Sequence, residues 1–326
     1  MDTSYERLIV GAATVDELLS DDFESLPGQK TDTDQATRRL AAWCRSCASG
    51  DWRQFARRLQ REGWDFPFVL ERFASVRRKP SAPLPAWIDD AVWIDAALRS
   101  AGGHAAEPVP GSGKPVAFEQ LLLPVVDEAE VRLWSGVDAQ TSALFTDQAR
   151  AGLRDALLQH LSGLCAPALY ALLDTVRPIG YRKFVADMKA DGFQRLFETK
   201  PVFLRLIATI TRQWIDATRE LIERLGSDLS VIRADLVVMA AEVRVAGIHS
   251  DLGDQHNGGR SVHIVTFTDD TRVVYKPKDL GVDVAWHTLV ERLNRSGPPV
   301  DLSAPRALAR PRVRVDRIHR ARRLLR

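Results

Sequence analysis

One stretch of the sequence, residues 253–276, constrains the fold more than any other. It reads GDQHNGGRSVHIVTFTDDTRVVYK, a glycine-bearing turn followed by two runs rich in β-branched and aromatic residues. The runs Ser261–Phe267 and Thr271–Tyr275 are typical of strands, and the polar residues between them predict a hairpin loop. Pro277 then ends the second strand, because proline has no N–H to donate to a sheet.

The two ends of this hairpin carry groups suited to binding phosphate. Gly258 and Gly259 let the backbone approach an anion closely, so that successive N–H groups face it. Lys276 stands directly after the second run, where its ammonium reaches back as a point charge toward a polyphosphate. The pattern therefore predicts a lid over the phosphates of a nucleotide.

The motifs GDQHNGGRSV and VVYKPKDL, followed by an apolar helix ending in LN, resemble the dehydratase domain of class II (LanM-type) lanthionine synthetases. Enzymes of this family use ATP to phosphorylate and then dehydrate Ser and Thr of a precursor peptide in lantibiotic biosynthesis. The resemblance extends over about residues 36–311, with specific motifs in 116–311. It implies a helical dehydratase portion followed by a kinase-like N-lobe, with ATP and Mg as cofactors and a precursor peptide as partner.

The resemblance also assigns roles to the polar residues before the glycines. Asp254 and His256 become the catalytic candidates, and His256 is able to donate to a phosphate or move a proton at neutral pH. The implied nucleotide-binding set is Lys276, Asn257, Gly258 and Gly259. The alternative is a turn held by Asx hydrogen bonds beside a solvated histidine. No metal site is predicted, because nothing fixes the geometry of these side chains as ligands.

A helix is expected directly after the hairpin, over Val282–Asn294. In kinases the phosphate-binding lysine is oriented by a Glu on this helix, and here Asp283 and Glu291 are the two candidates. We expect three apolar residues to pack the helix onto the hairpin: Trp286, Leu289 and Leu293.

The helical part of the chain, residues 36–243, precedes the hairpin. One apolar stripe illustrates the spacing: Leu121, Leu122, Val125, Ala129 and Leu133. A further helix begins at Pro201, and Gly226 is predicted to end it. Helices followed by a hairpin and a helix indicate an α+β class, here a mostly helical body and then a small, incomplete kinase-like fold.

Four segments follow from this pattern. They are an acidic, poorly ordered N-terminus (1–35), the helical part of the dehydratase domain (36–243), the kinase-like N-lobe segment with the lid and its lysine (244–311), and a basic tail (312–326). The catalytic lobe of the family, and the cyclase domain with its zinc site, lie beyond the resembling segment. We therefore expect a truncated dehydratase that is inactive alone. The alternative is a non-catalytic helical module that binds a peptide or protein.

Composition bounds the remaining possibilities. With 45% hydrophobic and 27% charged residues, the chain is globular. Its net charge of +2 includes +8 from residues 306–326, so the remainder carries −6 and a nucleic-acid partner is not expected. No signal pattern and no apolar run of membrane-spanning length are apparent, which favours a cytoplasmic protein. Cys44 and Cys47 have metal-like spacing, but their helical context favours two reduced cysteines.

The tail departs abruptly from the family pattern. Val313–Arg320 can be back-translated with permitted codons so that a shift of one base reads Tyr-Gly-Trp-Thr-Glu-Phe-Ile-Glu, which resembles the family at this point. An out-of-frame tail is expected to be disordered or a loose helix, and its deletion to leave the melting temperature unchanged. The alternative is a basic tail for nucleic acid or an anionic membrane.

Overall fold

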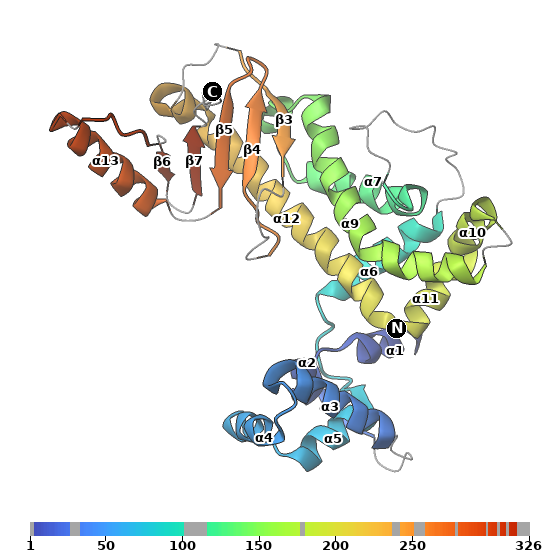
Figure 1. The fold of residues 1–326 in the computed structure, drawn as a ribbon. Coiled ribbons are helices and arrows are strands. Elements are labelled where there is room, and N and C mark those ends of the chain that lie inside the picture. The colour runs from blue at the N-terminus through green and yellow to red at the C-terminus, as the bar shows by residue number, and fades with distance from the viewer. Residues whose placement is uncertain are drawn as a thin grey trace. The chain divides into compact units, whose positions relative to one another are not determined.

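The computed structural model describes residues 3–26, 33–100, 116–176, 180–236, 242–250, 258–277, 280–297, 299–304, 307–310 and 313–317. These residues are mostly helical and form two small antiparallel sheets, which confirms the α+β class (Figure 1). The chain divides into two compact units. Unit 1 holds residues 1–95 and 191–208, and unit 2 holds residues 96–190 and 209–326.

Unit 1 is a set of short helices with a two-stranded sheet. Its elements are α1 (Thr3–Ala12), α2 (Val15–Leu19), β1 (Phe23–Ser25), α3 (Thr33–Ala48), α4 (Trp52–Arg61), α5 (Phe66–Ala74), β2 (Val76–Arg78) and α11 (Phe193–Thr199). The helices α6 (Trp87–Ser100) and α12 (Pro201–Val231) contribute residues to both units. Strands β1 and β2 pair antiparallel, with Phe23 opposite Arg78.

An aromatic cluster holds α3, α4 and α5 together. The ring centroid of Trp43 lies 5.0 Å from that of Phe55, in an edge-to-face arrangement, and 5.9 Å from that of Phe73. Such aromatic pairs stabilise a core beyond the area they bury. Asp51 caps α4 by accepting from the N–H groups of Arg53 and Gln54. Sequence periodicity and cap chemistry therefore agree with the observed helices here.

Residues 3–26 form two helices and a strand, whereas a poorly ordered segment was expected over residues 1–35. These elements bury apolar side chains in unit 1, among them Ile9, Leu19 and Phe23. The missed signal was the capping box Thr14-x-x-Glu17, in which each side chain bonds to the backbone N–H of the other residue.

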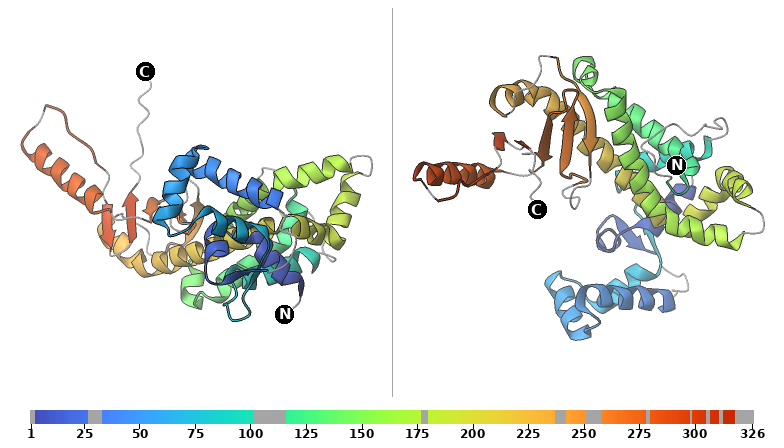
Figure 2. Two further views of the ribbon diagram at one scale, coloured as in Figure 1. Left: turned by 90° about the horizontal axis from the view of Figure 1, so that it is seen from below. Right: turned by 45° about the horizontal axis from the view of Figure 1, so that its top comes forward.

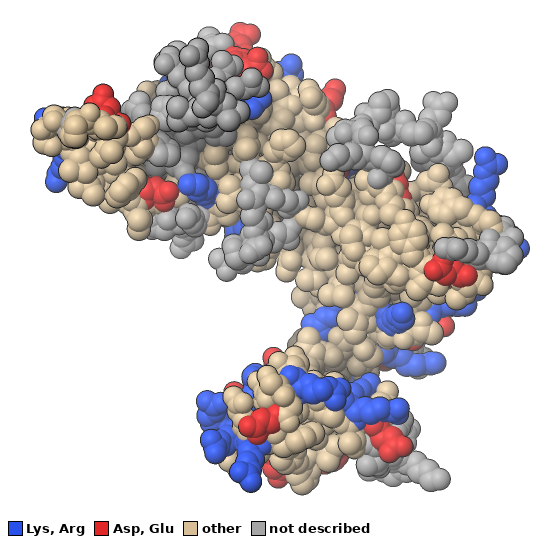
Figure 3. Space-filling view, viewed as in Figure 1, with Lys and Arg blue, Asp and Glu red and all other residues tan. Residues whose placement is uncertain are grey.

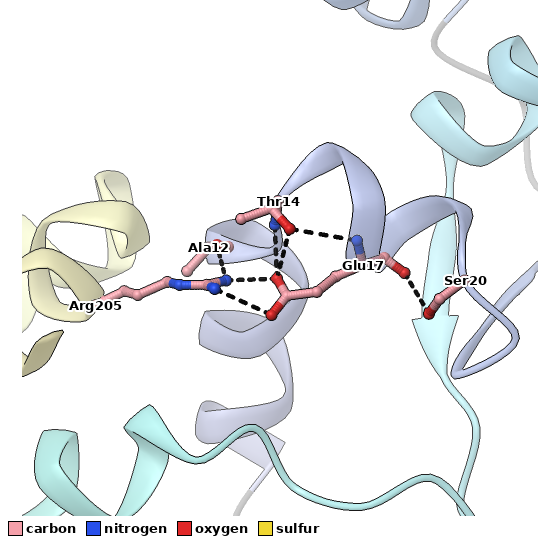
Figure 4. Close-up of polar contacts among 5 residues, drawn as sticks. All are labelled: Ala12, Thr14, Glu17, Ser20 and Arg205. Carbon is pink, nitrogen blue, oxygen red and sulfur yellow. Dashed lines mark hydrogen bonds and ion pairs between the residues drawn. The ribbon is translucent and has the colours of Figure 1, made fainter. Parts of the chain in front are cut away.

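Glu17 ties this segment to α12 (Figure 4). Its carboxylate accepts from both Arg205 guanidinium nitrogens, and Arg205 also donates to the carbonyl of Ala12 at 2.9 Å. Burial alone would raise the pKa of Glu17, but the bonds from Arg205 and Thr14 outweigh it and leave the pKa lowered. The ionised form is therefore the one that stabilises the fold.

We expect Glu17→Gln to lower the free energy of unfolding by about 1 kcal/mol at neutral pH, because hydrogen bonds to a half-exposed charge are lost. A carboxylate whose pKa is lowered by folding stabilises the folded state at pH values above its ordinary pKa of 4.5. This contribution is lost as the pH falls through the pKa that the group has in the folded state. Urea unfolding at several pH values should therefore show the parent and variant converging below pH 4.5. The control is Glu24→Gln, since Glu24 forms an exposed pair with Arg77. Equal losses in both variants at neutral pH would contradict the assignment.

Unit 2 contains several helices and short helical pieces. They are α7 (Glu119–Ser135), α8 (Ala139–Ala143), α9 (Asp147–Thr175), α10 (Tyr181–Asp187), the π-helical segment Ile232–Leu236, and the first residues of the π-helical segment Met188–Gly192, whose last residues belong to unit 1. The predicted stripe on α7 is buried at all five positions. The predicted helix end at Gly226 is wrong, because α12 continues to Val231. A Cβ on Gly226 would lie 2.9 Å from the side chain of Thr141, so this glycine permits close packing of α8 against α12.

One helix, α9, passes the length and composition test for a membrane span, which the sequence analysis did not anticipate. Its buried residues, including Leu153, Leu157 and Leu161, belong to the core of unit 2. A core helix of a soluble protein passes the same test, so the described residues give no clear membrane protein.

A five-stranded antiparallel sheet completes unit 2. Its strands are β3 (Val245–His249), β4 (His263–Phe267), β5 (Arg272–Lys276), β6 (Ala307–Arg310) and β7 (Val313–Arg317), in the spatial order β3-β4-β5-β7-β6. The predicted hairpin is β4–β5, with Val265 opposite Val273. Strand β3 was not predicted, and it pairs with β4 on the other side with a bulge near Gly247.

Alternation along β4 and β5 gives the sheet two different faces. Val265, Phe267, Val273 and Tyr275 are buried on the face toward α12, where Tyr275 meets Arg224. The residues between them are half-buried on the other face: Ile264, Thr266, Val274 and Lys276. Lys276 therefore projects from the face opposite the helical body.

Helix α13 (Gly281–Arg295) follows β5 and extends beyond β6 in all three views (Figures 1 and 2). The expectation that it packs on the hairpin through its apolar residues is wrong. Trp286 is 56% exposed, Leu289 46% and Leu293 41%, whereas Val290 is buried. Helical periodicity shows that an apolar stripe exists but not which neighbour covers it.

Part of the tail is a strand, contrary to the expected disorder. Val313–Arg317 form β7, which pairs with β5 on one side and β6 on the other. Deletion of residues 312–326 would therefore remove a central strand, and the expected unchanged melting temperature no longer follows. Whether the codons are out of frame stays a prediction about the gene.

Candidate functional site

The candidate site lies around the connection from β3 to β4 and the end of β5. Three predicted site residues, Asp254, His256 and Asn257, fall outside the described residues. Gly258 and Gly259 enter β4 with φ of +81° and +87°, a conformation that glycine adopts without steric cost. The glycine pair therefore joins the first two strands of the sheet, which is a more specific position than the turn predicted from the sequence.

Gly259 also approaches α12 closely. A Cβ built on it would lie 3.0 Å from the Gln213 Cβ and 3.3 Å from its carbonyl carbon, whereas a Cβ on Gly258 meets nothing within 4 Å. The two glycines thus share a backbone requirement but differ in their surroundings.

This contrast gives a matched pair of variants. Both Gly258→Ala and Gly259→Ala introduce left-handed strain of about 1–2 kcal/mol per residue. Gly259→Ala should cost about 1 kcal/mol more, because its methyl group forces β4 away from Gln213. Urea unfolding measures the difference between the two variants, and equal losses would show that the contact with α12 is unimportant.

Lys276 and Asp283 form the charged pair of the site. The Lys276 Nζ lies 3.3 Å from the Asp283 Oδ1, and the two side chains are 25% and 32% exposed. Asp283 is in the first turn of α13, so β5 and α13 together position the lysine. Of the two predicted partners the structure selects Asp283, because Glu291 pairs instead with His287 and Arg295.

A polar network lies on the opposite face of the sheet, against α12. The Arg224 guanidinium donates to the Tyr275 hydroxyl at 3.0 Å and pairs with Glu220, which also pairs with Arg260 at 2.6 Å. Burial raises the pKa of the Tyr275 phenol, and the Arg224 bond opposes this rise only in part. Tyr275 therefore stays protonated at neutral pH.

His263 on β4 belongs to the same face. Its Nδ1 lies 3.0 Å from the Ser250 hydroxyl oxygen, and its Nε2 lies 3.5 Å from the hydroxyl of the buried Ser261. Nearby is a hollow with an empty volume of about 430 Å³ that includes open solvent. Its lining includes His160, Gln213, Trp214, Gly259 and His263. The glycine turn thus forms one edge of a depression between the sheet and the helices, lined by both apolar and polar residues.

The sequence analysis missed this second polar set. His263 alternates with the buried Val265 and Phe267, so its position within the predicted strand placed it on the inner face. Glu220 and Arg224 are one helical turn apart, a spacing typical of an ion pair. Their meeting with Arg260 and Tyr275 depends on how α12 packs on the sheet, which periodicity does not reveal.

A family model matches the part of the chain that contains this site. Residues 201–313 match a domain of unknown function, DUF4135, a family associated with lanthionine synthetase-like proteins. The matched span contains α12, the strands β3, β4, β5 and β6, the helix α13 and the Lys276–Asp283 pair. No curated protein matches the chain.

Proposed function

We propose that unit 2 binds the phosphates of ATP in the manner of a kinase-like N-lobe. The observation that carries the proposal is the pair between Lys276 and Asp283, with Nζ and Oδ1 3.3 Å apart. In protein kinases a lysine on the third strand pairs with an acidic residue on the following helix, under a glycine-rich loop. Here β5 is the third strand of its sheet along the chain, α13 follows it, and Gly258–Gly259 join the first strand to the second.

The residues present fit a polyphosphate. Lys276 offers a cation on the face of the sheet away from the helical body, at the same end of the β4–β5 hairpin as the glycine turn. Gly258 has open space where a side chain would stand, so its backbone N–H is a second candidate for contact with phosphate, whereas Gly259 lies against Gln213 of α12. Among the described residues, no group of three or more His, Cys, Asp or Glu side chains is arranged to hold a metal. Magnesium enters the proposal as the ion that accompanies ATP.

The DUF4135 match and the sequence motifs favour a reaction class. We propose that the chain is the N-terminal part of a lanthionine synthetase dehydratase. Such an enzyme uses ATP to phosphorylate Ser and Thr of a precursor peptide and then eliminates the phosphate. In this scheme Asp254, His256 and Asn257 act from the loop over the phosphates, and the catalytic lobe is supplied beyond residues 201–313. Cytoplasmic location fits the need for ATP.

A thermal melt with ATP and Mg²⁺ tests this proposal. Ligand bound only by the folded state raises the melting temperature, and an excess of about 100 Kd adds about 2.7 kcal/mol. We expect ATP·Mg to raise the melting temperature, and inorganic phosphate at the same concentration to have a smaller effect. An unchanged melting temperature would favour the alternative, a helical module that binds a peptide or protein without a nucleotide.

A further inference from the structure

Arginines crowd one segment of unit 1. Residues 33–78 contain ten Arg, no Lys and five Asp or Glu, a net charge of +5, whereas residues 1–305 as a whole carry −6. The space-filling view shows blue atoms gathered over the region of α4 (Figure 3). The basic charge of this unit is therefore local and rests on guanidinium groups, which bind carboxylates through paired hydrogen bonds.

Three of these arginines form a row along α4. Arg53, Arg57 and Arg61 follow one another at intervals of four residues and all three are exposed. Residues four apart on a helix are neighbours, with Cβ atoms about 5–6 Å apart, so like charges there repel. The described part of the chain provides no ion pair for any of the three. We name these residues the arginine row.

The arrangement contrasts with the other helices. Elsewhere an arginine finds a carboxylate one turn away, as in Arg132–Glu128, Arg195–Asp191 and Arg224–Glu220. Within the arginine row the residue one turn from an arginine is another arginine, whereas Arg58, which is outside the row, has Glu62 one turn away. The arginine row thus has no carboxylates of its own helix to pair with. It presents three guanidinium groups at a regular spacing on the surface, and carboxylates from another segment would pair with them.

We propose that the arginine row is the docking surface for an acidic peptide segment of a partner. Carboxylates one turn apart on a helix repeat at the same interval of about 5–6 Å as the row, so each guanidinium meets one carboxylate. A membrane surface fits less well, because Phe55 and Leu59 of α4 are buried inside unit 1, which leaves Trp52, at 46% exposure, as the one large apolar residue of this helix that is available to insert. Nucleic acid also fits less well, because a row about 12 Å long reaches few phosphates.

The proposal is independent of ATP binding, since the arginine row belongs to unit 1 and the Lys276 site to unit 2. Fluorescence anisotropy on the full chain tests it, with three labelled probes. They are a short Ala-based helical peptide with Glu at every fourth position, the same peptide with Gln in place of Glu, and a single-stranded oligothymidylate. We expect the Glu peptide to bind at low salt, the Gln peptide not to bind, and the oligothymidylate to bind more weakly than the Glu peptide.

Two triple variants complete the test. Arg53→Gln/Arg57→Gln/Arg61→Gln should weaken binding of the Glu peptide at least about tenfold and leave the melting temperature unchanged or slightly higher, because repulsion is removed. The matched control, Arg182→Gln/Arg272→Gln/Arg292→Gln, removes the same charge from exposed positions in unit 2 and should bind as the parent does. Equal weakening in both variants, tighter binding of the oligothymidylate, or no binding of the Glu peptide would overturn the proposal.

Discussion

Lys276→Ala should abolish most of the rise in melting temperature that ATP·Mg gives the parent protein. A charge-assisted bond to phosphate contributes about 1.5–3 kcal/mol, so its loss weakens binding about tenfold to a hundredfold. The variant itself should remain folded, because the Lys276–Asp283 pair is partly exposed and such pairs contribute about 0–1 kcal/mol. Melting curves with and without ATP·Mg, at matched protein concentrations, measure both effects.

Two companion variants sharpen this result. Asp283→Asn keeps the shape of the partner but removes its charge, so Lys276 is held less firmly and binding should weaken by a smaller factor. Lys183→Ala removes an exposed lysine of α10 and should leave the ATP effect intact. If Lys276→Ala and Lys183→Ala respond to ATP·Mg as the parent does, Lys276 is not a phosphate ligand.

Phe267→Ala should destabilise the protein by about 3–5 kcal/mol, a large fraction of the stability of an ordinary domain. Phe267 is 1% exposed on β4, on the face of the sheet that packs against the helical body. The cavity left behind loosens β4 from its neighbours, and the proposed ATP site depends on that strand. Urea unfolding gives the loss of stability, and ATP·Mg should partly restore the midpoint because it binds only the folded sheet.

The control for this variant lies on the same strand. Ile264 is half-buried on the opposite face, so Ile264→Ala should cost about 1 kcal/mol, well below the cost for fully buried residues. Similar losses at the two positions would mean that the sheet does not present one buried and one open face. Such a result would also remove the argument that Lys276 projects away from the helical body.

Patterns within a short stretch of sequence were sufficient to predict the helices and strands whose buried face follows from the spacing of their apolar residues. The stripe from Leu121 to Leu133 is buried because an apolar residue every three or four positions forms one helical face. The β4–β5 hairpin was predicted because alternation, β-branched residues and the loop all agree. Lys276 was placed at the end of its strand for the same reason.

The remaining features depend on contacts between segments distant in sequence. Strand β3 contains Ala and Gly, which weaken its strand signal, and its place is fixed only by pairing with β4. Gly226 resembled a helix end, but its role is close packing against Thr141. The stripe on α13 is apolar yet exposed, because nothing in a periodic pattern states which surface will cover it.

The candidate site was predicted in part. Lys276 and the two glycines were identified, and Asp283 was one of two proposed partners. The network of Glu220, Arg224 and Tyr275 was missed because it joins a helix to a strand, with Arg224 and Tyr275 51 residues apart in the sequence. Asp254 and His256 stay predictions, since they lie outside the described residues.

The proposed function requires Lys276 to lie beside the phosphates of bound ATP. A biotin acyl phosphate of ATP tests this directly, because the probe acylates a lysine amine held next to the phosphate chain, and peptide mass spectrometry locates the modified residue. We expect modification of Lys276 that excess ATP·Mg suppresses, and no such suppressible modification of the exposed Lys183. Modification of Lys276 that ATP·Mg does not suppress, or suppressible modification at other lysines instead, would contradict it.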